Sequence, residues 1–245
     1  MGFRIDSRKM RQINMRRQSV LTLAIDQATK LGSAAVLQDS TLLAARQWEE
    51  HPLCHQSLFE ELQKLLEKAA CTVADINLFG VNIGPGSFTG IRMAVSALRA
   101  MALPGRQPVI GITCGEALTV ESIIGNHWRL PVAVVGDARR DRFWFGRFET
   151  AIAPTSMRNA YTLVDPAELG QHLADIGVVI TSDWDRIGPQ LIAVAPPTCE
   201  VIQSPRYPDA AIVARLAWSR HQRGGPFETP LPIYMNPAVA VKARG

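Results

Sequence analysis

A strand that runs directly into a glycine-rich loop and then into a helix is the feature that most constrains the fold of this chain. The run INLFGVNI (76–83) is predicted to be a buried strand, and GPGSFTG (84–90) follows it with three glycines in seven residues. A helix is predicted from about 89 to 103. Strands precede this unit and a further strand and helix follow it, so the sequence predicts an α/β fold.

The other predicted elements divide the chain into two halves. In the first half we expect an antiparallel meander of three strands, a helix, and a strand–helix pair after the glycine loop, at 20–26, 32–38, 41–49, 53–70, 108–113 and 114–124. In the second half we expect two strands, a helix with Asp165 as its N-cap, a strand and a last helix, within 130–149 and at 165–174, 177–181 and 208–225.

The expected division is a disordered basic extension over 1–19, a first domain over 20–124, and a more divergent second domain over 125–245 with a Pro-rich tail. The extension carries six Lys/Arg and one Asp. The formal net charge of +4 for the chain therefore leaves −1 for the remaining residues. A nearly neutral body excludes a broadly basic nucleic-acid surface. The extension could bind an anionic partner such as RNA, could be merely disordered, or could precede a true start at Met10 or Met15.

Composition and cysteine usage predict a protein of the cytoplasm. The chain of 245 residues is 47% hydrophobic and 20% charged, which is typical of a globular protein. We expect neither a membrane span nor a secretion signal, because the sequence has no apolar run of about 18 residues and no apolar segment near its start. Its four cysteines, with no CxxC pair, fit buried thiols in a reducing compartment.

The glycine loop allows two interpretations. It lacks the lysine of a phosphate-binding P-loop, and Thr89 stands where a dinucleotide motif needs its third glycine. Free N–H groups at the start of the following helix could still attract an anion. Alternatively, Gly84, Gly86 and Gly90 permit a tight strand-to-helix turn and close packing.

Two other polar patterns are weak indications of a site. Asp26 and Thr29 follow the first strand and could meet a metal-bound water or a phosphate, or could form a local turn. His51 and His55 have the spacing of a zinc pair, but Pro52 begins the helix and no third ligand is evident. We therefore expect no metal site.

The helix after the glycine loop has two apolar faces. Its polar residues, Arg92, Ser96 and Arg99, form one narrow stripe. One apolar face suffices to cover a sheet, so the second, with Met93, Ala97 and Ala100, is either deeply buried or covered by a helix of another protein.

Several segments together resemble the TsaB family, also called YeaZ, of bacterial tRNA threonylcarbamoyladenosine biosynthesis proteins. In chain order they are LAIDQAT (23–29), HQSLFEELQKLL (55–66), GPGSFTGIRMA (84–94), PVIGITCGEAL (108–118), VAVVGDARRDRFWFGRF (132–148) and PIYM (232–235). The resemblance covers about residues 20–236, and its most specific part is 84–92.

This resemblance implies a two-domain actin/Hsp70/hexokinase-like (ASKHA) fold and a role in assembly. TsaB is the non-catalytic paralogue of TsaD, which transfers the threonylcarbamoyl group to adenosine 37 of ANN-reading tRNAs. TsaB holds TsaD through helices of its first domain, and TsaE joins with ATP. For this chain the implied partner interface is Leu58, Leu62, Met93, Ala97 and Ala100. The implied structural loop is Gly84, Gly86, Ser87, Thr89, Gly90 and Arg92.

The resemblance also implies that the chain is not an enzyme. Gln27 and Ala28 replace the glycine-bearing phosphate hairpin of the superfamily, which leaves Asp26 and Thr29 as remnants of a nucleotide site. We expect no catalytic residue, no metal and no cofactor in this chain, with ATP and Mg²⁺ bound by partners. tRNA is reached through the complex, a homodimer is possible, and no membrane is involved. The alternative is a glycoprotease-like metallohydrolase, which rests on fold analogy alone.

Overall fold

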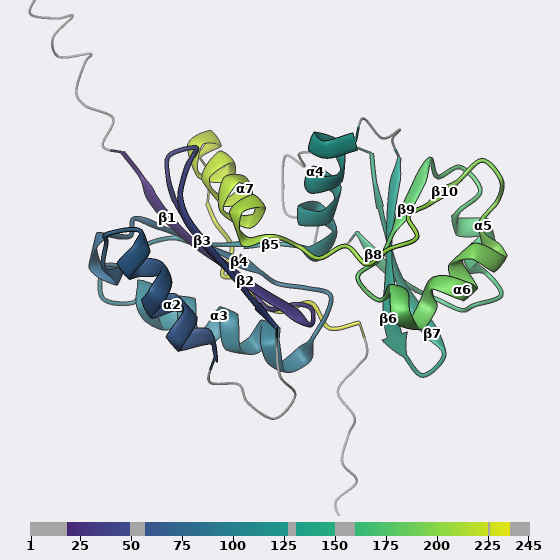
Figure 1. Ribbon diagram of the computed structural model, residues 1–245, viewed down its shortest axis with the longest axis horizontal. Helices are drawn as coiled ribbons and strands as arrows, with labels where there is room; N and C mark the ends of the chain where they lie inside the picture. The colour runs from purple at the N-terminus through teal and green to yellow at the C-terminus, as the bar shows by residue number, and fades with distance from the viewer. Residues whose placement is uncertain (1–18, 50–56, 127–130, 150–159, 225, 236–245) are drawn as a thin grey trace, which may run out of the picture.

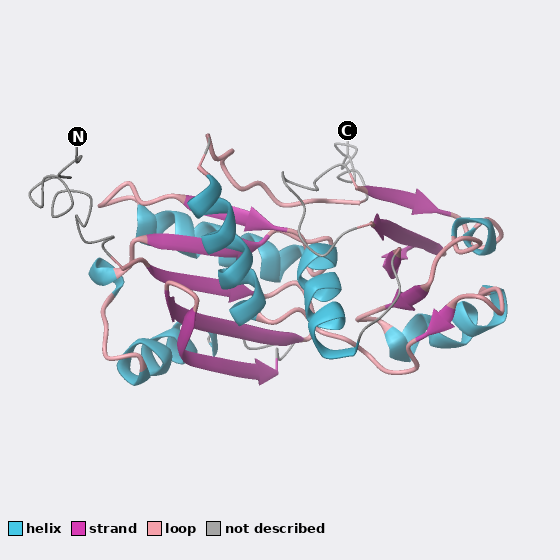
Figure 2. Ribbon diagram, turned by 90° about the horizontal axis from the view of Figure 1, so that it is seen from above, coloured by secondary structure: helices cyan, strands magenta, loops and turns pink. Residues whose placement is uncertain are grey.

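The computed structural model describes residues 19–49, 57–126, 131–149, 160–224 and 226–235. These residues form two five-stranded sheets that lie side by side along the long axis of the molecule, with helices on their faces (Figures 1 and 2). In the part of the chain so described, no helix is both long and apolar enough to span a bilayer.

The first sheet has the strand order β3-β2-β1-β4-β5. Its strands are β1 (Leu21–Asp26), β2 (Leu31–Gln38), β3 (Thr41–Glu49), β4 (Leu78–Asn82) and β5 (Val109–Ile112). The antiparallel pairs β1/β2 and β2/β3 confirm the predicted meander, and β4 and β5 add parallel strands on the other side of β1. The carboxyl ends of β1, β4 and β5 therefore meet at one edge of the sheet.

Helices cover both faces of the first sheet. On one face lie α2 (Ser57–Lys68) and α3 (Phe88–Ala102), whose apolar stripes share a core with Leu23, Phe79 and Val81. The short 3₁₀ helix η1 (Val73–Asp75) leads from α2 to β4. The opposite face is covered by α7 (Ala210–Arg223), which packs on Ala24, Leu78 and other residues of β1, β2, β4 and β5.

The second sheet repeats the topology of the first. Its order β10-β9-β6-β7-β8 is again a meander, β6 to β8, followed by two parallel strands. Its strands are β6 (Val132–Arg139), β7 (Arg142–Phe148), β8 (Tyr161–Val164), β9 (Val178–Ile180) and β10 (Glu200–Val201). Helices α5 (Leu169–His172) and α6 (Trp184–Val194) cover one face, and α4 (Cys114–Asn126) covers the other. The predicted α/β fold class is confirmed, and the two sheets share one strand order.

Two of the predicted helices differ from the structure, and β8, α6 and β10 were not predicted. The predicted second domain included α7, but this helix packs on the first sheet, so the chain returns there after completing the second sheet. The predicted helix over 165–174 is only Leu169–His172 with Glu168 at its N-cap. Asp165 is not the cap, because its carboxylate accepts a hydrogen bond from Arg142 at 3.1 Å. The boundary near residue 124 stays a prediction, since α4 contacts the cores of both sheets.

Candidate functional site

Polar side chains gather where β1, β4 and β5 end, and we call Asp26, Asn82 and Thr113 the strand-end site. All three are fully buried. Asp26 Oδ1 accepts from the Ala28 amide at 3.0 Å, and Asn82 Oδ1 accepts from the Gly84 amide at 2.9 Å. The Thr113 hydroxyl accepts from the Glu116 amide at 3.3 Å. Each side chain thus fixes the turn that follows its own strand, which is the local role that short polar residues commonly have.

The glycine loop packs directly on the turn between β1 and β2. The Ser87 amide donates to the Ala28 carbonyl at 2.7 Å. A Cβ at Gly86 would lie 2.2 Å from the Ala28 oxygen, and a Cβ at Gly90 would lie 2.1 Å from the Gln27 oxygen. Only Gly84, with φ +94°, needs glycine for its backbone conformation as well. The glycines therefore allow the backbone of the loop to pack against the backbone of the β1–β2 turn. A phosphate-binding hairpin at that turn would need to be open instead.

The remaining predicted residues of this region stay near the surface. Ser87 caps α3 by accepting from the Gly90 amide at 3.3 Å, and Thr89 is exposed. Thr29 donates its hydroxyl to the Leu31 carbonyl at 3.1 Å. The Arg92 guanidinium lies 5.1 Å from the centre of the Phe88 ring. These side chains thus contact neighbouring residues of their own chain, and the structural role of the loop stays a prediction.

The two sheets meet near Cys114, at the start of α4. Burial raises the pKa of the Cys114 thiol well above its ordinary value, and the Asp26 and Asp183 carboxylates raise it further. Burial also raises the pKa of Asp183, whose carboxylate accepts from the Asp137 amide at 2.9 Å. A protonated buried thiol is a poor nucleophile. Within the described ranges, no three His, Cys, Asp or Glu side chains are grouped as metal ligands, while His51 and His55 lie outside those ranges.

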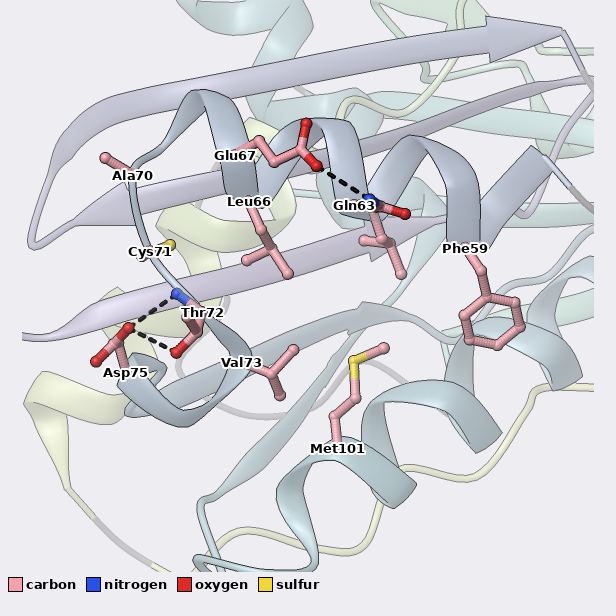
Figure 3. A pocket seen from close by; sticks show the side chains of 11 residues that line it. Phe59, Gln63, Leu66, Glu67, Ala70, Cys71, Thr72, Val73, Asp75 and Met101 are labelled. Carbon is pink, nitrogen blue, oxygen red and sulfur yellow. Dashed lines mark hydrogen bonds between the residues drawn. The ribbon is translucent and has the colours of Figure 1, made fainter.

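An open groove lies between α2, α3 and η1, and we call it the α2–α3 groove (Figure 3). It has a volume of about 540 Å³. Its lining is Phe59, Leu62, Gln63, Leu66, Glu67, Ala70, Cys71, Thr72, Val73, Asp75 and Met101. Figure 3 shows Phe59 and Leu66 projecting from α2 toward Met101 on α3. The Phe59 side chain is 56% exposed, an unusual position for a large ring.

Two carboxylates stand on the rim of this apolar groove. The Glu67 carboxylate accepts a hydrogen bond from the side-chain amide of Gln63 at 3.0 Å. Asp75 accepts from the backbone and hydroxyl of Thr72 at 2.8 and 2.7 Å, and these hydrogen bonds hold the pKa of Asp75 below its usual range. Asp75 therefore stays charged at neutral pH, and the groove combines an apolar floor with a negative rim.

The structure corrects part of the predicted partner interface. The side chains of Leu58 and Leu62 on α2 are buried in the core of the first sheet, and Ala97 on α3 is only 8% exposed. These side chains therefore pack within the chain. Met93 is half-buried and Ala100 is exposed. Helical periodicity identified 58, 62 and 65 correctly as one apolar stripe, but that stripe faces the sheet.

Phe59, Leu66 and Met101 line the groove but were not part of the predicted interface. Positions 59, 63, 66 and 70 recur at helical spacing beside the core stripe, so a second stripe was visible in the sequence. What the sequence could not show is that this second stripe remains open.

Comparison with known proteins places these features in a family. The family model described as TsaD, tRNA N6-adenosine threonylcarbamoyltransferase, matches residues 53–165. The tRNA threonylcarbamoyladenosine biosynthesis protein TsaB of Escherichia coli K12 is 30% identical over 132 residues, which are 52% of this chain and 54% of that protein. The match thus spans about half the length of that relative. An uncharacterised Mycobacterium tuberculosis protein (strain H37Rv) is 31% identical over 59% of this chain and 67% of its own length.

Two solved structures have the same fold. A Pseudomonas aeruginosa protein described as similar to peptidase YEAZ has a TM-score of 0.73 at 21% identity, covering 89% of this chain and all of that one. YeaZ from Pseudomonas aeruginosa has a TM-score of 0.69 at 23% identity, covering 88% and 99%.

The fold and the site together define an α/β protein with two sheets of the same strand order, in which the turn after β1 is closed by the backbone of the glycine loop and an apolar groove lies between the helices on one face of the first sheet. Within that class, the chain belongs to the TsaB/YeaZ family.

Proposed function

We propose that this chain is a non-catalytic subunit of the machinery that makes threonylcarbamoyladenosine in tRNA. In this role it binds a TsaD-like catalytic subunit, a TsaE-like ATPase joins them, and tRNA is reached through the complex in the cytoplasm. Support comes from the family, whose named members are tRNA threonylcarbamoyladenosine biosynthesis proteins. Further support comes from the match of the TsaD family model to residues 53–165, which include α2, α3 and the glycine loop.

The observation that carries the proposal is the open α2–α3 groove. Exposed apolar surface that is continuous and has a charged rim is typical of a protein–protein interface. Phe59 and Leu66 from α2 and Met101 from α3 supply that surface, and both helices lie on the same face of the first sheet (Figure 3). We therefore assign the partner contact to this groove together with two residues of the predicted interface, the half-buried Met93 and the exposed Ala100.

The strand-end region supports the non-catalytic part of the proposal. The Asp26 carboxylate binds its own turn, and the glycine loop lies against the Gln27 and Ala28 carbonyls. A nucleotide phosphate would have to displace these backbone contacts. We propose that the chain holds no cofactor of its own, and that ATP and Mg²⁺ of the assembled complex are bound by its partners.

The alternative prediction, a glycoprotease-like metallohydrolase, has less support. A hydrolase needs an activated nucleophile or a metal-held water. The thiol at the junction of the sheets, Cys114, is buried and its pKa is raised, so it stays protonated at neutral pH. No observation on the described residues favours this alternative over assembly.

Size-exclusion chromatography with a TsaD-like protein of the same genome tests the proposal. We expect a complex with the unmodified chain, and a loss of affinity of about 30-fold or more for Phe59→Ala, because a central aromatic residue is worth about 2 kcal/mol or more. Ile192→Ala is the matched control, since Ile192 is 50% exposed on α6, away from the groove. Equal binding by both variants would place the interface elsewhere, and a complex that never forms would reject the assembly role.

A further inference from the structure

The rim of the α2–α3 groove is acidic without any opposing charge in its lining. Among the eleven residues that line the groove, Glu67 and Asp75 are charged and none is Lys or Arg. The hydrogen bonds from Thr72 keep Asp75 ionised. A ligand that suits this groove therefore combines apolar side chains for Phe59 and Met101 with positive charge for the rim.

The N-terminal segment of this chain begins beside that rim. The Leu21 amide donates to Asn77 Oδ1 at 2.8 Å, and the Asn77 amide donates to the Leu21 carbonyl at 2.9 Å. Asn77 lies only two residues after Asp75 at the end of η1, and Leu21 packs against the same core as α2 and α3. The described chain therefore begins close to the η1 end of the groove.

The composition of residues 1–18 matches what the groove needs. This segment has one acidic residue, Asp6, and six basic ones, Arg4, Arg8, Lys9, Arg11, Arg16 and Arg17. Apolar residues are interleaved with them, at Phe3, Ile5, Met10, Ile13 and Met15. Eighteen residues can span up to roughly 60 Å, whereas the twelve residues of α2 are only about 18 Å long. The segment is long enough to cover the whole groove.

We propose that residues 1–18 fold back onto the α2–α3 groove and act as an intramolecular ligand of it. The apolar side chains then contact the floor formed by Phe59, Leu66 and Met101, and the basic side chains face Glu67 and Asp75. Since both are in one chain, the effective concentration is in the millimolar range, so even weak contacts give substantial occupancy. The segment would then compete with any protein that binds the groove, and would be released by salt.

Crosslinking within the full chain tests this contact. In a Cys54→Ser background, Ile13→Cys supplies a thiol in the segment, and Cys71 supplies one in the groove, because Cys114 and Cys199 are buried. A short bismaleimide at micromolar protein should join the two within one chain, as mapped by mass spectrometry. The yield should fall about threefold to tenfold when the six basic residues are changed to Gln, as expected when occupancy is lost. It should fall similarly in about 0.5 M salt.

Charge reversal in the groove gives the matched comparison. Glu67→Arg should reduce the yield as much as the change of six residues does, whereas Glu228→Arg, at an exposed carboxylate outside the groove, should not. Equal yields in all four chains would overturn the proposal. A crosslink between chains whose yield rises with protein concentration would assign the groove to a second copy and would also overturn it. The measurement uses the chain alone, so its outcome is independent of whether a TsaD-like subunit binds.

Discussion

The strand-end site and the α2–α3 groove differ in whether their side chains are bound within the chain or are accessible to another molecule. The strand-end site and the glycine loop beside it contain the residues that stand out in the sequence, namely Asp26 and the loop glycines. There, however, carboxylate, amide and glycine backbone are engaged by the chain itself. The groove is built from ordinary helix residues such as Phe59 and Met101, and it remains open to solvent.

This difference separates what a motif does for the fold from what a surface can do for function. Where the space beside a glycine is filled by another backbone segment, that glycine serves the fold, and the space is not available to a ligand. The exposed Phe59 ring, beside the half-buried Met101 side chain, has no such structural purpose, so it is the better indication of a binding surface. The predictions below test each side of this comparison.

The largest expected effect is the loss of stability when a carboxylate is introduced on the buried face of α3. Leu98→Glu should cost more than about 4 kcal/mol and unfold the domain, because its side chain is 0% exposed and a buried carboxylate would have no partner. Ala97→Glu should cost about 2 kcal/mol, since Ala97 lies at the edge of the same core. Urea unfolding measures both.

Ala100→Glu is the control for this series. Ala100 is exposed, so the free energy of unfolding should change by less than about 0.5 kcal/mol. If Ala97→Glu were as harmless as Ala100→Glu, the α3 face would be open to a partner, as the family resemblance implied.

A smaller loss of stability should follow when a methyl group is added to the glycine loop. Gly90→Ala places a Cβ 2.1 Å from the Gln27 carbonyl oxygen, so the loop must move away from the β1–β2 turn. We expect a loss of about 3 kcal/mol, read from thermal or urea unfolding. Gly105→Ala is the control, because its new Cβ would meet only the flexible end of Gln107. Equal small losses would mean that the strand-end region is looser than its contacts indicate.

A weaker effect should appear in the pH dependence of stability at the α2 wall of the groove. The pKa of Glu61 is lowered by the Lys64 ammonium on the same helix and by the Arg46 guanidinium, whose ion pair with Glu61 ties α2 to β3. Because the folded pKa is depressed, this stabilisation is present above the ordinary pKa near 4.5 and is lost as pH falls below it. The loss should be under about 1 kcal/mol, since Arg46 and Lys64 are partly exposed. In Glu61→Gln the acidic loss should shrink by that amount, and an unchanged profile would contradict the prediction.

The smallest expected effect is that of nucleotide. If the closed strand-end region binds ATP no more tightly than about 1 mM, then 1 mM ATP with Mg²⁺ stabilises the chain by less than about 0.5 kcal/mol. A thermal shift near zero, together with no heat of binding in calorimetry, is the expected result. A dissociation constant in the micromolar range would break the comparison, because the strand-end site would then be a working nucleotide site.

Much of the fold was predictable from local pattern. The opening meander, the buried strand before the glycine loop and the helix after it follow from apolar periodicity, and each is present. The helix at 184–194 was not predicted, and Asp165 was wrongly given the role of an N-cap. A carboxylate near a helix start can serve the cap or an ion pair, and only the position of Arg142 on the adjacent strand decides which.

The sequence by itself determined which positions must be small or apolar: Gly86 and Gly90 in the loop, and the stripe of Leu58, Leu62 and Leu65 on α2. These requirements are local, because a helix or a tight turn imposes them on neighbouring residues. What covers each position was decided only by the tertiary structure. The loop meets the backbone at Gln27 and Ala28, some sixty residues away, and α7 returns from the end of the chain to cover the first sheet. The stripe through Phe59 and Leu66 stays open because no described element packs over it, and periodicity alone cannot distinguish an open stripe from a covered one.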